Sequence, residues 1–225
     1  MKSYIIHLPN YTSSVSMATN TLNSGTTLGW DLELFQGIDG QTVATDNNWA
    51  KHNVKFNETD KKCRKMLDRP GVRGCFLSHW YLWNVCITND APIGIFEHDI
   101  TFLKPPIFDL NFEDILKLEN LGKQKSRPAG VWYQGATGYI IKPAGAKKLK
   151  EWIHTNGCLP ADVVMGENVV SLAFENNNLR MWFAKYSERW FRRQNYWDYF
   201  MYGIVRISRR KVLYPLGRYG ALRFL

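Results

Sequence analysis

The chain has 225 residues and a formal net charge of +9, from 29 lysines and arginines against 20 aspartates and glutamates. No stretch approaches the roughly 20 apolar residues of a membrane span, and the opening residues do not look like a secretion signal, so we expect neither. The four cysteines show no metal-type pairing, and we therefore expect reduced thiols in a cytoplasmic protein.

Strands and helices alternate along the chain, which is typical of an α/β fold, and the length suits a single domain over 1–225. The elements expected in the first half are strands at 4–8, 32–38 and 93–96, a loop and helix over 9–25, a short helix at 61–67 and an internal helix at 75–87. The apolar pattern of that internal helix places Cys75 and Cys86 in the core.

The second half is expected to continue the alternation. Its elements are an exposed helix at 112–121, a basic loop at 122–130, strands at 131–134 and 138–141, a helix from Pro143 to Asn156, a helix at 163–174 and a late strand at 179–184. Asp162 stands at the expected N-cap of the helix over 163–174.

The strand at 93–96 is apolar at nearly every position and ends in Glu97, His98 and Asp99. Such a strand is typically covered on both faces, and open α/β sheets bind ligands at the carboxyl ends of their strands. Because a buried carboxylate without a partner is costly, a divalent ion that carries a diphosphate would satisfy both acids. The alternative is that the two acids begin a solvated loop.

Basic and aromatic residues are interleaved in the C-terminal segment, 186–225. This composition suits an anionic partner, either a phospholipid surface or a nucleic acid. The alternative is a helix whose aromatic side chains complete the core while its arginines face water. The charge therefore indicates an anionic partner but does not distinguish a phospholipid surface from a nucleic acid.

One motif runs from Gly74-Cys75 through Ser78-His79 to the strand that ends in Glu97-His98-Asp99. Four further segments accompany it in order: Tyr4–Pro9, Gly37–Gly40, Gly138–Ile141 with the helix through Leu149, and Pro160–Asp162. Together these motifs resemble glycosyltransferase family 25, whose pattern is Gly-Cys-x-x-Ser-His followed by Glu-Asp-Asp. The family includes lipopolysaccharide galactosyltransferases and collagen galactosyltransferase domains.

The resemblance implies a GT-A-like domain with a central, mostly parallel sheet flanked by helices. It also implies an inverting, metal-dependent hexosyl- or pentosyltransferase with a UDP-sugar donor. Carried over, Asp99 coordinates Mn²⁺ or Mg²⁺, and Glu97 contacts the ribose or a metal-bound water. His98 departs from the family's usual aspartate, and a nitrogen ligand there would favour Mn²⁺.

The donor-binding residues that the resemblance adds are Leu8, Pro9, Ser78 and His79. For His79, orienting its helix and simple core packing are alternatives. Adjacent residues on a helix point about 100° apart, so Ser78 and His79 do not form a nucleophile–base pair easily.

An inverting transfer needs a carboxylate base near the anomeric carbon. Asp162 is the first candidate and Glu167 the second, while a plain N-cap is the alternative role for Asp162. Family members often carry arginines just after the first strand, where this chain has residues 10–14 without basic side chains. The candidates for a basic contact to the diphosphate are Arg73, Lys104 and Lys142.

The sequence leaves the acceptor open. The resemblance favours a lipopolysaccharide-type or other surface glycan, with the basic segment resting on the inner membrane. One alternative is DNA with hydroxymethylated pyrimidines, as in bacteriophages that glycosylate their genomes in the host cytoplasm. Another, which His98 suggests, is an inactive fold retained as a binding module.

Overall fold

The computed structural model describes residues 1–43, 49, 52, 54–55, 57, 59–107, 109–118 and 135–175. These residues belong to one compact unit. The loop expected at 122–130, the strands expected at 131–134 and 179–184, and the basic segment 186–225 lie outside the described residues. The single domain over 1–225 therefore stays a prediction.

The described residues form a six-stranded sheet with the order β2-β1-β3-β5-β4-β6. The strands are β1 Ser3–His7, β2 Leu32–Gln36, β3 Ile93–Glu97, β4 Ile115–Lys117, β5 Gly138–Ile141 and β6 Leu172–Phe174. Strand β1 pairs parallel with β2 and β3, and β4 pairs parallel with β6, whereas β5 runs antiparallel to β3 and β4. The expected α/β fold with a mostly parallel sheet is confirmed.

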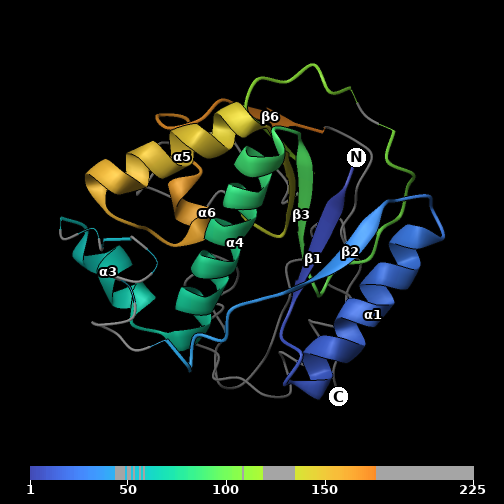
Figure 1. Ribbon diagram of the computed structural model, residues 1–225, viewed down its shortest axis with the longest axis horizontal. Coiled ribbons are helices and arrows are strands. Elements are labelled where there is room, and N and C mark those ends of the chain that lie inside the picture. The colour runs from blue at the N-terminus through green and yellow to red at the C-terminus, as the bar shows by residue number, and fades with distance from the viewer. Residues whose placement is uncertain are drawn as a thin grey trace, which may run out of the picture. The chain divides into compact units, whose positions relative to one another are not determined.

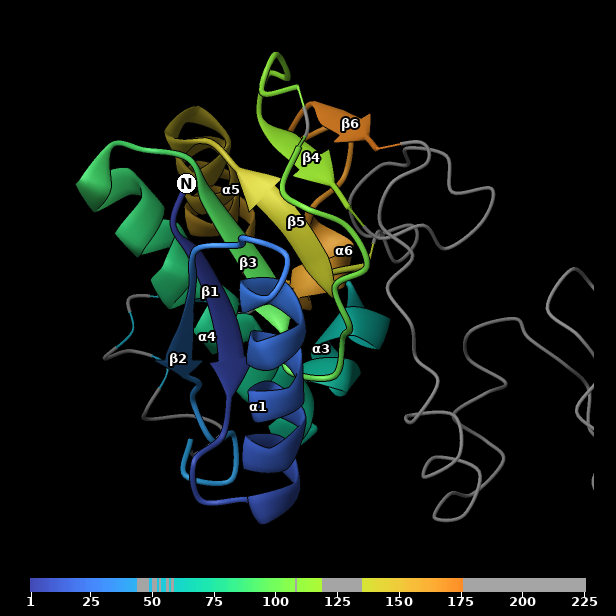
Figure 2. The same cartoon turned by 90° about the vertical axis from the view of Figure 1, so that its right-hand side faces the viewer.

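Helices cover both faces of this sheet. They are α1 Thr12–Thr26, α3 Lys61–Leu67, α4 Pro70–Asn89, α5 Pro143–Asn156 and α6 Ala161–Val164. Helix α1 lies on one face, and α4 and α5 lie on the other (Figures 1 and 2). No helix in the described part of the chain has the length and apolar character needed to cross a membrane.

Alternation along the strands divides the buried side chains into two cores. Phe96 and Ile140 face the core on the α1 side, which Trp30 helps to fill. Ile95 and Tyr139 face the larger core on the α4 side. Because side chains of a strand alternate between faces, Glu97 follows Ile95 onto the α4 side of the sheet.

Two expectations for the second half are wrong. The region 112–121, expected as an exposed helix, contains the buried strand β4 between β5 and β6. The strand includes Lys117, a residue type that is rarely buried; here its ammonium group donates to the carbonyl of Gly135. The helix expected at 163–174 is short: α6 ends at Val164, Asp162 lies in its first turn, and the chain then enters β6.

Helix α4 meets the turn after β2 through direct backbone contact. A Cβ atom on Gly74 would lie 2.4 Å from the carbonyl oxygen of Ile38, and one on Gly40 would lie 1.7 Å from that of Pro70. The Ser78 hydroxyl donates to the Gly74 carbonyl at 2.6 Å and accepts the Ile38 N–H at 2.9 Å. This contact fixes the position of the side chains that follow on α4.

Gly74→Ala should therefore lower the free energy of unfolding by about 1–3 kcal/mol, because the added methyl group meets backbone that cannot yield. Gly71→Ala is the matched control on the same helix, since a Cβ there has nothing within 4 Å. The control should be neutral or slightly stabilising. Urea unfolding of the two variants checks this, and equal stability would contradict the contact.

Candidate active site

The carboxyl ends of β1 and β3 meet at one edge of the sheet. Ile6 of β1 is in register with Glu97, the last residue of β3. The residues after them, His7 and His98, are close enough to interact: burial lowers the pKa of His7, and the neighbouring His98 lowers it further. This edge is where a parallel sheet presents ligand-binding residues.

The chain leaves β1 at this edge through Leu8 and Pro9. Leu8 is half-buried and Pro9 is exposed. The N–H of Leu8 donates to the Ser14 hydroxyl of α1 at 2.9 Å. Leu8 and Pro9 are thus held beside the end of β3, where the resemblance places donor contacts.

The segment after β3 is clamped from the α1 side and carries a poorly satisfied carboxylate. The Thr21 hydroxyl lies 2.7 Å from the carbonyl oxygen of His98 and 2.6 Å from that of Ile100. Oδ1 of Asp99 is buried and finds no hydrogen-bond partner among the described residues. Burial raises the pKa of Asp99, while His98 opposes that rise.

The charges of three carboxylates act on the thiol of Cys75 on α4. Burial raises the pKa of this thiol well above its ordinary value, and Glu97, Asp162 and Asp99 each raise it further. Its Sγ atom lies 3.8 Å from Oε1 of Glu97. Asp162, from α6, is therefore near enough to act on the same thiol as Glu97, the last residue of β3, and Asp99, which follows it.

His79 lies one helical turn beyond Cys75 and is fully buried. Its Nδ1 is 2.8 Å from the hydroxyl of Tyr139, which also accepts the indole N–H of Trp83 at 2.9 Å. Burial, with a smaller effect from Lys117, lowers the pKa of His79 to about 3. The imidazole is therefore neutral at ordinary pH, and it lies in the core rather than at the surface of the site.

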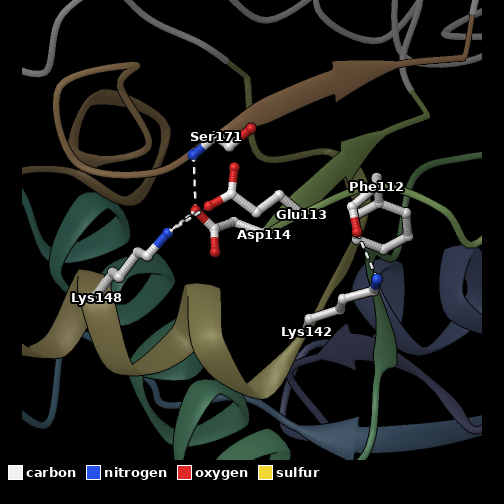
Figure 3. A network of polar contacts seen from close by, with 6 residues as sticks. All are labelled: Phe112, Glu113, Asp114, Lys142, Lys148 and Ser171. Atoms are coloured by element: carbon white, nitrogen blue, oxygen red, sulfur yellow. Dashed lines mark hydrogen bonds and ion pairs between the residues drawn. The ribbon is translucent and has the colours of Figure 1, made fainter.

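A separate pocket of about 450 Å³ lies at the opposite edge of the sheet. Its lining consists of Glu113, Lys148 and residues 167–172. Beside it, the buried Asp114 accepts hydrogen bonds from Lys148 at 2.7 Å and from the Ser171 N–H at 2.8 Å (Figure 3).

The strand register shows why this pocket is remote from the carboxylates. Asp114 immediately precedes Ile115 in β4. Ile115 pairs with Ile141 of β5, and Ile141 pairs on its other side with Ile93, the first residue of β3. Glu167, the second candidate for the base, lines this pocket and is not brought to the edge that carries Glu97.

Comparison with known proteins identifies the family of this chain. The model described as "Glycosyltransferase family 25 (LPS biosynthesis protein)" matches residues 1–128. The chain belongs to glycosyltransferase family 25. The match includes the end of β3 and stops before Asp162.

Two relatives agree with this family assignment. A "Glycosyltransferase 25 family member" of Aedes aegypti is 24% identical over 209 residues, which are 82% of this chain and 33% of that protein. A "Putative glycosyltransferase" of Haemophilus influenzae is 32% identical over 161 residues, which are 63% of this chain and 54% of that protein. The matched region thus spans about a third of one relative and about half of the other.

Two of the basic side chains expected at the diphosphate of this family 25 member, Arg73 and Lys142, make other contacts. Arg73 is buried and donates to the carbonyls of Leu67 and Gly40 at 3.2 and 3.3 Å. Lys142 follows the antiparallel β5, so it lies at the opposite edge, where it donates to the carbonyl of Phe112 (Figure 3). Lys104 contributes a backbone contact: its carbonyl accepts the indole N–H of Trp30, which lies just before β2, at 2.9 Å.

Some contacts of the site were not predicted from the sequence. Cys75 packs against the core, as expected, but its thiol also lies beside Glu97, and no individual role was predicted for Tyr139 or Lys117. The spacing of Cys75 and His79, four residues apart on a helix, could have shown that both face the same strand end.

The buried His79 predicts a specific pH dependence of stability. Its pKa is about 3 in the folded protein and about 6.5 in the unfolded chain, so the unfolded chain binds a proton first as the pH falls. Stability from this residue is present above pH 6.5 and declines by up to about 1.4 kcal/mol per pH unit below it.

His79→Gln should therefore flatten the dependence of unfolding free energy on pH between about 6.5 and 4. His154→Gln, an exposed position on α5, should leave the slope unchanged. Urea unfolding with a chelator present, repeated across this pH range, measures both. A wild-type slope in His79→Gln would show that the imidazole is not held neutral.

Proposed function

We propose that the protein is an inverting, metal-dependent glycosyltransferase that moves a hexosyl or pentosyl group from a UDP-sugar to an acceptor hydroxyl. Membership of glycosyltransferase family 25 supports the transferase class. The observation that carries the proposal is the buried Oδ1 of Asp99, which has no hydrogen-bond partner among the described residues, two positions after Glu97 at the carboxyl end of β3. Asp162 supports it, because its charge reaches the Cys75 thiol, which lies 3.8 Å from Glu97. A cation near these acids would favour their ionised forms.

The residues present fit a divalent cation. The buried Oδ1 of Asp99, which has no hydrogen-bond partner in the described part of the chain, is a hard oxygen donor of the kind that Mn²⁺ and Mg²⁺ prefer. Asp99 and Glu97 would hold the ion, with the His98 imidazole available beside them. Such an ion would stabilise the negative charge of the departing UDP diphosphate.

The remaining steps belong to side chains of this chain. Leu8 and Pro9 border the edge of the sheet where the donor nucleotide would lie. Ser78 and His79, which are buried on α4, would support this edge from the core. Asp162 would accept the proton of the acceptor hydroxyl while that oxygen bonds to the anomeric carbon. The bond from that carbon to the diphosphate breaks on the opposite face, so the configuration inverts.

A surface glycan of the lipopolysaccharide type is the acceptor we propose, supported by the description of the matching family as an LPS biosynthesis protein. DNA with hydroxymethylated pyrimidines is the second candidate, and the basic, aromatic composition of 186–225 favours it. Transfer assays with each acceptor separate the two. Either acceptor fits an enzyme working in the cytoplasm, at an inner membrane surface or in an infected host cell.

The first test concerns Asp99. Asp99→Asn should reduce Mn²⁺-dependent release of UDP from the UDP-sugar by about 100-fold or more, because it removes the charged oxygen donor. Asp90→Asn is the control: this exposed residue before β3 has a φ of 46°, which asparagine tolerates. Chromatographic assay of UDP release measures both variants. Wild-type protein that turns over no UDP-sugar with Mn²⁺ would instead support the inactive binding module.

The second test concerns stereochemistry and Asp162. An α-linked UDP-sugar should give a β-linked product, identified by the anomeric proton coupling in the NMR spectrum. Asp162→Asn should lower kcat by about 100-fold or more and change the donor KM little, as expected for a general base. An α-linked product would contradict the inverting mechanism, and an unchanged kcat would remove Asp162 as the base.

A further inference from the structure

We propose that Cys75, His79 and Glu97 form a binding site for a thiophilic transition-metal ion of the zinc class. The sulfur, nitrogen and carboxylate oxygen that these residues offer lie within 4.8 Å of one another. The site is distinct in chemistry from the oxygen-rich pair of Glu97 and Asp99 proposed above for the donor's cation. It uses Glu97 in common with that pair.

The backbone arrangement suits three ligands. Cys75 and His79 are one turn apart on α4, so their side chains lie on the same face of the helix. Glu97 faces them from the end of β3, with Oε1 already 3.8 Å from the Cys75 Sγ. In a tetrahedral zinc site, bonds of about 2.0–2.3 Å place ligand atoms roughly 3.5 Å apart. Small side-chain rotations would close the remaining gap.

The buried imidazole points independently to a ligand. Nε2 of His79 is buried and has no hydrogen-bond partner in the described part of the chain. Its Nδ1 is held by the Tyr139 hydroxyl, which is itself fixed by Trp83. Metal-binding histidines are usually oriented by such a hydrogen bond at the other ring nitrogen. Nε2 is therefore the nitrogen left for an ion.

Charge and donor softness indicate which ion would bind. Asp99 and Asp162 act on Cys75 in addition to Glu97, whereas Lys117 acts on His79 with the opposite charge. Three acids against one lysine favour a cation at the site. A thiolate and an imidazole select Zn²⁺ over Mg²⁺ or Mn²⁺. On binding, the Cys75 thiol loses its proton to solvent and the sulfur bonds to the metal. The half-buried position of Cys75 leaves it accessible.

Occupation of this site would withdraw Glu97 from the donor. Zn²⁺ would then inhibit sugar transfer, a consequence that rests on the proposed function, whereas binding of the ion does not. Inhibition, measured relative to each protein's own rate, should be weaker in Cys75→Ser than in the wild type.

Titration of the full chain with Co²⁺ tests the binding. Co²⁺ bound to a thiolate gives an intense near-ultraviolet charge-transfer band, and we expect one equivalent to produce it and Zn²⁺ to abolish it. Cys75→Ser should remove the band, and His79→Gln should weaken Co²⁺ binding more than about tenfold. Cys86→Ser, a change at another cysteine of α4, should retain the band. Circular dichroism confirms that each variant is folded.

The outcomes separate this inference from the proposed function. Absence of the band in the wild type, or its persistence in Cys75→Ser, overturns the site. Asp99→Asn should keep the band, because Asp99 is not one of the three ligands. A cobalt–thiolate band in a protein that transfers no sugar would support the metal site and contradict the transferase.

Discussion

Negative charge held at the carboxyl end of β3 is the constraint on which the site depends. Glu97 ends a strand covered on both faces, Asp99 follows two residues later, and Asp162 from α6 is near enough for its charge to act on the same Cys75 thiol. Mutual repulsion and desolvation disfavour the ionised forms of neighbouring, partly buried carboxylates, so the surrounding fold must hold them there. An ion or ligand of positive charge would relieve that repulsion, which is why we interpret this edge as a binding site.

Both helical layers contribute to holding the carboxylates. On one face, the Thr21 hydroxyl of α1 bonds to the backbone on either side of Asp99. On the other, the glycine contact between α4 and the turn after β2 leaves no room for adjustment at the start of the helix. The hydrogen bonds that join His79, Tyr139 and Trp83 then connect α4 to β5 inside the core. The acids are thus positioned by packed backbone and buried polar groups rather than by a loop alone.

Local sequence patterns predicted the parts of this fold that have strong periodicity. The apolar run before Glu97, the internal helix α4 and the proline-started helix α5 were found because burial of each extends over several residues. The short strand β4 was missed, since it includes a lysine whose burial depends on a distant carbonyl. Asp162 was predicted as a site residue only through the family resemblance, because no local pattern links it to β3. The contact of Cys75 with Glu97 was not predicted, because the neighbours of Cys75 on α4 are apolar and indicate core.

The most direct test of the central claim is paramagnetic broadening of backbone amide resonances by Mn²⁺ in the presence of UDP. The account predicts selective broadening at Glu97 to Asp99 and at Ala161 to Val163, with amides around Asp114 and Lys148 at the opposite edge unaffected. Broadening centred on Asp114 and Glu167, or spread evenly over the surface, would contradict it.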